Sequence, residues 1–191
     1  MIGDGFVRVL ERAREGDELA WTALYDDLSG PILGYLRGHG APEPEDQLGE
    51  TFLQMARDLP RFDGDEAGFR SWVFTIAHRR LLDAARTRRR RPVTPLEPDR
   101  LVPVADEVRA TTDAQDATAA AILSFEDREL LADLLEHLTE DQREVLLLRF
   151  VADLDTATTG EVTGRSANAV AALTTRALAT LRGVIEAQQA A

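Results

Sequence analysis

Residues 69–91 read FRSWVFTIAHRRLLDAARTRRRR, and this stretch carries the strongest periodic pattern in the chain. Its apolar side chains recur at i, i+3, i+4, i+7 and onward: Phe69, Trp72, Val73, Ile76, Ala77, Leu81 and Ala84. Such spacing aligns one apolar face of an α-helix. Between residues 79 and 91, seven arginines stand against one aspartate, a local net charge of +6. We therefore expect an amphipathic helix that packs on one side and ends in a strongly basic segment.

The residues before this helix also favour helical structure. Asp17 is suited to cap a helix with leucines at helical spacing, and Pro31 is expected to bend or restart it. Pro44 fits the first turn of the next helix. Residues 61–68, RFDGDEAG, have the composition of a turn, with Gly64 and Gly68 available for unusual backbone dihedrals.

The stretch 92–127 differs in kind from its flanks. It holds four prolines, and eight acidic residues against two arginines give it a net charge of −6, half of the whole-chain value of −12. This composition predicts a flexible acidic linker. We accordingly expect a first domain over residues 1–91 and a second over residues 128–191.

Four helices are expected around and after the end of the linker. The first spans residues 126–137, and Thr139 with Gln142 forms a capping box for the second. Asp155 is suited to cap a short third helix, and Ser166 a longer fourth. The expected inner face of the fourth is Val170, Leu173, Ala177, Leu178 and Leu181.

A short helix, a tight turn and a longer helix form a helix-turn-helix. No segment has the alternation of a strand. The predicted fold class is all-α: two small helical domains joined by a flexible acidic linker, the second a helix-turn-helix.

The composition argues against several functional classes. The chain of 191 residues has no cysteine and no apolar run near the ~20 residues of a membrane helix. Its three histidines are isolated, and no phosphate-binding glycine motif occurs. The acidic cluster of Glu43, Glu45, Asp46 and Glu50 is interpreted as a first helical turn or a docking face rather than a metal site. We expect no enzyme, no cofactor, no metal and no membrane insertion, and a cytoplasmic location.

Nucleic-acid binding is better supported, because two features agree. Aromatic residues accompany the basic helix, namely Phe62, Phe69, Trp72 and Phe74, and rings beside arginines suit an unstacked base and its phosphates. The second feature is the helix-turn-helix. Residues 128–185, however, hold six arginines and nine acids, a net charge of −3. Since phosphate contacts dominate DNA affinity, so few cations predict binding only within a larger assembly.

Three stretches resemble a known family. Residues 20–40 (AWTALYDDLSGPILGYLRGHG) and 42–92, which include the basic helix, resemble the second conserved region of extracytoplasmic-function (ECF) sigma factors of the sigma-70 family. Residues 138–182 (LTEDQREVLLLRFVADLDTATTGEVTGRSANAVAALTTRALATLR) resemble the fourth. The resemblance implies a subunit that binds core RNA polymerase and directs transcription from specific promoters.

The resemblance also implies roles for matching residues. The residues expected to dock on core polymerase are Asp46, Glu50, Phe52 and Leu53. Those expected to read and melt the −10 element are Arg61, Phe62, Asp63, Gly64, Phe69, Trp72, Phe74, Arg79, Arg80, Asp83 and Arg86. Those expected at the −35 element are Arg165, Ser166, Asn168, Ala169, Ala171, Ala172, Thr175 and Arg176. An anti-sigma factor is an expected further partner.

The helix-turn-helix departs from the family pattern. Ala171, Thr174 and Thr175 stand where basic or amide residues are common, and Thr158, Thr159 and Gly160 weaken the preceding short helix by about 1–2 kcal/mol. Two alternatives therefore stay open. One is a sigma-like interaction module with weakened promoter reading. The other is a stand-alone helix-turn-helix regulator that binds its operator without polymerase.

Overall fold

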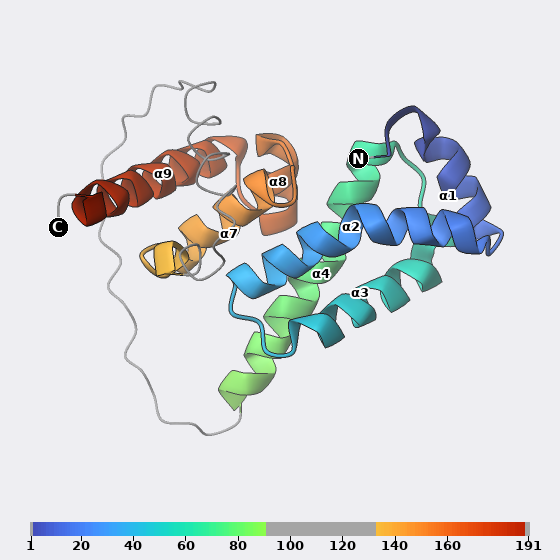
Figure 1. The fold of residues 1–191 in the computed structure, drawn as a ribbon, viewed down its shortest axis with the longest axis horizontal. Coiled ribbons are helices and arrows are strands. Elements are labelled where there is room, and N and C mark those ends of the chain that lie inside the picture. The colour runs from blue at the N-terminus through green and yellow to red at the C-terminus, as the bar shows by residue number, and fades with distance from the viewer. Residues whose placement is uncertain (1, 91–132, 190–191) are drawn as a thin grey trace.

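The computed structural model describes residues 2–90 and 133–189, and every regular element in them is helical (Figure 1). The expected all-α class is thereby confirmed. The expected linker, 92–127, lies outside the described residues, as does most of the helix expected over 126–137, of which residues 133–136 are helical.

Two groups of helices make up the structure. The first bundle contains α1 (Phe6–Arg14), α2 (Glu18–Gly38), α3 (Pro44–Asp58) and α4 (Glu66–Arg90), with short 3-10 turns at Gly3–Gly5 and Leu59–Arg61. The second bundle contains residues 133–136, α7 (Glu140–Phe150), α8 (Thr156–Thr163) and α9 (Ala167–Gln189). Helices α8 and α9 form the helix-turn-helix.

The expected helix caps are present. The Asp17 carboxylate accepts a hydrogen bond from the Ala20 amide at 2.9 Å, and Asp155 accepts one from the Thr158 amide at 2.7 Å. Thr139 and Gln142 form the reciprocal capping box. Because a carboxylate that accepts amide hydrogen bonds is stabilised as the anion, the pKa of Asp17 and that of Asp155 are lowered.

Several local expectations are corrected. Of the two outcomes expected at Pro31, a bend or a restart, the restart does not occur: α2 continues through Pro31, and the preceding Gly30 has no Cβ to meet the proline ring. Gly64 and Gly68 do not take positive φ angles; Gly68 lies within α4, where its amide donates to the Asp65 carboxylate at 2.8 Å. On α9, Thr174 is buried and Leu173 only partly so, and the Thr174 hydroxyl donates to the Val170 carbonyl.

Gly160 has a structural reason that the sequence pattern did not reveal. A Cβ at this position would lie 2.6 Å from the carbonyl oxygen of Arg165, in the turn that follows α8. The Arg165 amide in turn donates to the Gly160 carbonyl at 2.8 Å. The glycine therefore lets the turn close tightly on α8, where a better helix former would be excluded.

The two bundles share one hydrophobic core. Leu24, Ile32 and Phe74 of the first bundle and Leu147 and Leu148 of the second belong to a single cluster of buried residues. Helix α7 packs beside α2, and α8 beside α4 (Figure 1). None of the helices in residues 2–90 and 133–189 has the length and apolarity to cross a bilayer.

Candidate nucleic-acid and protein interfaces

Helix α3 presents an acidic face with an apolar neighbour. Asp46, Glu50 and Leu53 follow one another at intervals of four and three residues, and all are exposed, Leu53 by 52%. Phe52 is half-buried, with its ring 5.0 Å from that of Tyr25 on α2, itself 50% exposed. Tyr25 was not among the docking residues predicted from the sequence. Its position beside the buried stripe of Leu24 and Leu28, rather than on it, is the signal that could have identified it as exposed.

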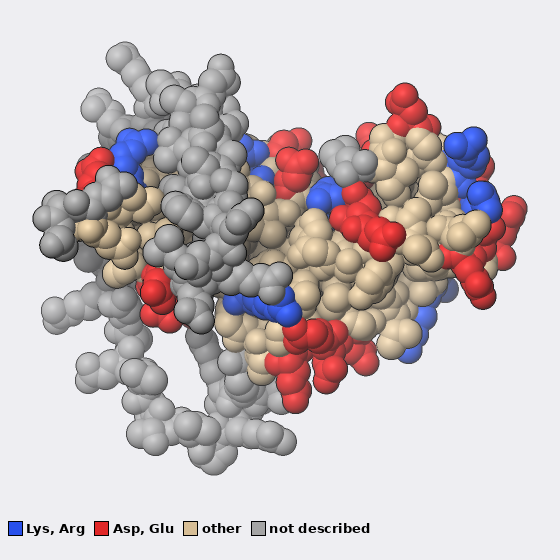
Figure 2. Space-filling model, in the orientation of Figure 1, with Lys and Arg blue, Asp and Glu red and all other residues tan. Residues whose placement is uncertain are grey.

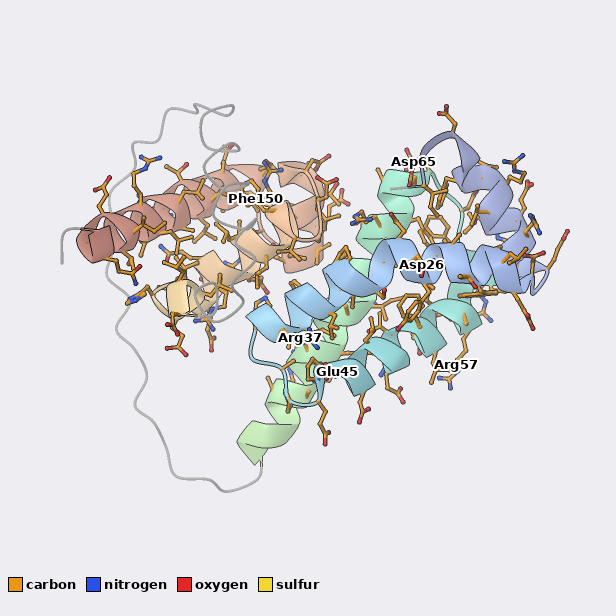
Figure 3. All side chains as sticks on the ribbon, viewed as in Figure 1. Asp26, Arg37, Glu45, Arg57, Asp65 and Phe150 are labelled. Atoms are coloured by element: carbon orange, nitrogen blue, oxygen red, sulfur yellow. The ribbon has the colours of Figure 1, made fainter. Side chains whose placement is uncertain are left out.

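Acidic side chains gather over the start of α3. Figure 2 shows this group along the lower edge of the molecule. Figure 3 shows Arg37, at the end of α2, facing Glu45 in the first turn of α3, and the two form an ion pair. The acidic first turn of α3 is thus partly neutralised by Arg37, whereas Asp46 remains exposed to solvent.

An aromatic cluster lies where α3 gives way to α4. The rings of Phe62 and Trp72 stack at 5.1 Å between centroids with planes 28° apart. Phe69 lies 5.3 Å from Phe62 and 5.3 Å from Phe6 of α1. Both Phe62 and Trp72 keep part of their surface exposed, whereas Phe69 is 2% exposed.

A cavity of about 490 Å³ opens beside the stacked pair. It is lined by Asp58, Arg61, Phe62, Asp63 and Trp72. Two rings, a guanidinium and carboxylates therefore surround one open space, a combination that suits stacking on a planar base with hydrogen bonds at its edge. Asp58 was not predicted from the sequence, because it is the last residue of α3 and lies before the 61–68 turn on which the prediction was based.

Phe69 and Phe74, two of the aromatic residues expected in the melting segment, are core side chains in this structure. Phe74 is 0% exposed and meets the ring of Tyr35 edge-on at 5.8 Å. Phe69 meets Phe6 of α1, and Phe74 meets Tyr35 of α2. The accessible aromatic surface is therefore that of Phe62 and Trp72. Asp63 and Gly64 are exposed beside it.

The basic part of α4 is partly engaged with acids. Arg80 pairs with Glu50 of α3 at 3.1 Å, and Arg86 pairs with Asp83 at 3.1 Å on the exposed surface. Arg79 is exposed. The Arg80–Glu50 pair links the expected −10-reading helix to the acidic face of α3. The structure does not describe the side chains of residues 87–91.

The helix-turn-helix exposes most of its expected contact residues. Ser166, Asn168, Ala171 and Arg176 are exposed, while Ala169, Ala172 and Thr175 are half-buried. The Arg176 side chain folds onto its own helix, where Nε donates to the Ala172 carbonyl at 3.2 Å. Arg165, in the turn, lies 2.7 Å from Asp141 and 3.6 Å from Glu144, both on α7.

A second cleft, of about 620 Å³, lies between the bundles. It is lined by His39, His78, Leu81, Leu82, Ala85, Arg86, Glu140, Asp141, Arg143, Glu144, Thr163 and Arg165. Burial lowers the pKa of His39 to about 4, with Arg143 and His78 adding to the effect. Burial also lowers the pKa of His78 and raises that of Glu144. Within residues 2–90 and 133–189, no three His, Asp or Glu side chains gather as metal ligands.

Comparison with known proteins places both halves in one family. The model of sigma-70 region 2 matches residues 24–91, and that of sigma-70 region 4 matches residues 128–181. The ECF RNA polymerase sigma factor ShbA of Streptomyces griseus is 30% identical over 185 residues, covering 93% of this chain and 94% of ShbA. The ECF RNA polymerase sigma factor BldN of Streptomyces coelicolor is 28% identical over 177 residues, covering 92% of this chain and 64% of BldN.

A solved structure shares the fold. CnrH, determined in complex with the cytosolic domain of CnrY, aligns with a TM-score of 0.64 at 23% identity, covering 96% of this chain and 99% of CnrH. A helix-turn-helix beside helical bundles is typical of DNA-binding transcription factors. More specifically, the chain belongs to the ECF sigma factors of the sigma-70 family.

Proposed function

We propose that this sigma factor binds core RNA polymerase through α3, holds a flipped −10 base beside Phe62 and Trp72, and lays the start of α9 on the −35 duplex. ECF sigma factors direct promoter-specific transcription initiation. The observation that carries the proposal for this chain is the open cavity beside two stacked, half-exposed rings and Arg61.

Base capture is energetically reasonable at this cavity. Stacking on an aromatic side chain contributes about 1–3 kcal/mol per base, similar to the few kcal/mol needed to extrude a base from duplex DNA. A volume of about 490 Å³ lies within the range of pockets that take small molecules. Arg61 and the carboxylates of Asp58 and Asp63 supply donors and acceptors for the edge of the base.

Polymerase docking is supported by the chemistry of α3. The face combines the carboxylates of Asp46 and Glu50 with the exposed apolar surface of Leu53 and Tyr25. An apolar centre with charged surroundings is typical of a protein interface, and acids steer a basic partner toward it. We assign this face to core polymerase.

DNA binding by α9 depends on the polymerase in this proposal. Within the expected contact set, Arg176 is exposed and has no acidic partner at salt-bridge distance in the described residues, whereas Arg165 is paired with Asp141 and Glu144. The phosphate contacts that position a protein on DNA are thus few. The protein acts in the cytoplasm, by binding rather than by catalysis, and an anti-sigma factor is a further proposed partner.

One observation favours a second candidate. Because Arg165 is already paired with two acids, an interaction module that binds polymerase without reading the −35 element also fits. The two candidates differ in their products, since such a module would yield no promoter-specific transcript.

The test is reconstitution with core polymerase on the source bacterium's genomic DNA, with start sites mapped. We expect discrete start sites that share upstream sequences, and loss of upstream protection with Arg176→Ala. Random start sites would contradict promoter direction. Unchanged upstream protection at every start site with Arg176→Ala would contradict the −35 assignment.

A further inference from the structure

The segment between α3 and α4 supplies most of the cavity beside Phe62 and Trp72. Four of the five lining side chains stand on residues 58–63, and the fifth, Trp72, is carried by the long helix α4. The segment itself is a 3-10 turn of three residues, Leu59–Arg61, followed by extended backbone at Phe62 with φ −71° and ψ 132°. Because so short a turn has few hydrogen bonds of its own, the position of Arg61 and Phe62 depends on the contacts that the turn makes with its neighbours.

Arg14, the last residue of α1, makes such a contact. Its Nη2 donates to the Phe62 carbonyl, and its Nε donates to the Leu59 carbonyl at 3.4 Å. The Leu59 carbonyl also accepts from the Phe62 amide at 3.2 Å, so the two acceptors of Arg14 belong to one tight turn. A planar guanidinium presents its donors in a fixed fork, which suits two carbonyls at a set separation. Arg14 therefore fixes the backbone from which the Phe62 ring projects.

Helix α1 is itself firmly placed against α4. Phe6, in its first turn, is 3% exposed, and its ring lies 5.3 Å from that of Phe69. Before the helix begins, the Gly3 amide donates to the Glu66 carboxylate at 3.0 Å, so the start of the chain lies beside the start of α4 (Figure 1). The side chain of Arg14 thus reaches the turn from a helix that is anchored to the same element that carries Trp72.

We propose that Arg14 is a positioning residue for base capture, which acts through the turn that carries Arg61 and Phe62. The match to sigma-70 region 2 begins at residue 24, so this role belongs to a helix that precedes the matched part of the chain. The inference rests on the proposed function for its effect at the promoter, whereas the contact with the turn can be measured without DNA. A site that is already ordered before its ligand arrives loses less free energy on binding, so release of the turn should weaken base capture.

Fluorine NMR of the full-length chain tests the contact with the turn. The chain has two tryptophans, so 5-fluorotryptophan labelling gives one resonance for each of them. We expect Arg14→Met to shift or broaden the Trp72 resonance, because the Phe62 ring that stacks on Trp72 is no longer fixed. Arg14→Lys, which can still donate to a carbonyl, should stay closer to the wild type. Arg8→Met, which removes an exposed arginine from the same helix, is the matched control.

Two outcomes of this measurement would overturn the proposal. One is an unchanged Trp72 resonance in Arg14→Met. The other is an equal change at Trp21 and Trp72, because it would indicate a general loosening of α1 rather than release of the turn.

The consequence for base capture is measured with core polymerase at a mapped start site, by permanganate reactivity of unpaired thymines. Arg14→Met is expected to lower the yield of open complexes about three- to tenfold and to leave binding to core polymerase unchanged. In the Trp72→Ala background the same substitution should add almost nothing, because the stack through which Arg14 acts is already lost. A loss of stability alone would lower the yield in both backgrounds.

The results that contradict the positioning role are distinct from those that contradict the proposed function. A wild-type yield of open complexes for Arg14→Met, or full additivity of Arg14→Met and Trp72→Ala, would overturn the positioning role. The absence of any promoter-specific transcript from the wild-type chain would overturn the proposed function, while the fluorine resonance of Trp72 would still report the contact of Arg14 with the turn.

Discussion

The Arg70 guanidinium donates a hydrogen bond to the carbonyl of Ala152, a residue 82 positions further along the chain, and it is almost fully buried in doing so. The same side chain pairs with Asp27 at 3.1 Å. One arginine on α4 thereby joins two helices of the first bundle to the turn after α7.

Removal of this arginine should be strongly destabilising. Arg70→Ala removes the guanidinium that pairs with the Asp27 carboxylate, whose side chain is 16% exposed in the wild type, and so we expect a loss of about 3 kcal/mol in the free energy of unfolding. Urea denaturation measures this directly. The double variant Arg70→Met/Asp27→Leu, which removes both charges, should recover most of the loss.

Arg86→Ala provides the contrast. Arg86 pairs with Asp83, but their side chains are 70% and 72% exposed. Such exposed pairs contribute at most about 1 kcal/mol to the free energy of unfolding. A loss as small for Arg70→Ala as for Arg86→Ala would show that the Arg70 contacts do not stabilise the fold.

Replacement of two glycines of the second bundle by alanine should change the stability of the fold in opposite directions. Gly160→Ala places a methyl group 2.6 Å from the Arg165 carbonyl, so the turn must shift, and we expect a loss of about 1–3 kcal/mol. Gly183→Ala in α9 meets nothing within 4 Å, and it should gain about 0.5–1 kcal/mol through helix propensity. Thermal melts that ranked the two variants the other way would refute this account of the turn.

Trp72→Ala should impair promoter opening more than initial binding. Loss of the Trp72 ring removes an aromatic surface on which the base stacks, worth about 1–3 kcal/mol, which corresponds to roughly a 5- to 150-fold drop in open complexes. Permanganate reactivity of unpaired thymines measures opening, and gel retardation of the polymerase complex measures binding. Trp21→Ala controls for loss of a tryptophan, because Trp21 donates to the Ala13 carbonyl away from the cavity. Equal effects of both variants on opening would contradict base capture.

Acidification should weaken the fold through His39 and His78. The pKa of His39 is about 4 in the folded chain against 6.5 for the free side chain, so the unfolded chain binds the proton more readily. Stability is therefore lost as pH falls from 6.5 toward 4, by about 1 kcal/mol at pH 5.5 for His39 alone. The lowered pKa of His78 acts in the same direction, whereas the raised pKa of Glu144 opposes it.

Urea titrations at pH 7.5 and 5.5 test this prediction. His39→Phe keeps a ring against Tyr35 but cannot be protonated, so its stability should change less between the two pH values. His137→Phe, at an exposed position, is the control for the substitution itself. An unaltered pH response in His39→Phe would rule out the histidine as a source of the acid sensitivity.

Local chemistry made much of this fold predictable. The caps at Asp17, Thr139, Asp155 and Ser166 each require only residues within four positions, and all four are present. The apolar spacing of α4 likewise identified its buried face, because helical periodicity is a local property. It did not identify Phe74 as core, since that burial depends on Tyr35 of α2.

The contact between the two helical bundles could not be predicted from the sequence. Arg70 stands between Phe69 and Ser71 in a basic helix, and nothing in that position reveals an acceptor 82 residues away. Gly160 looked like a weak helix former because its close neighbour, the Arg165 carbonyl, is brought there by the turn. Contacts set by tertiary packing between distant segments leave no periodic signal.

The central claim is that selective DNA binding by this chain requires core polymerase. A labelled DNA fragment carrying one mapped start site, titrated with the full-length protein in fluorescence anisotropy, tests it most directly. We predict sequence-specific binding only when core polymerase is present. Equal affinity for that fragment without polymerase, or no association of the chain with polymerase at all, would contradict the account.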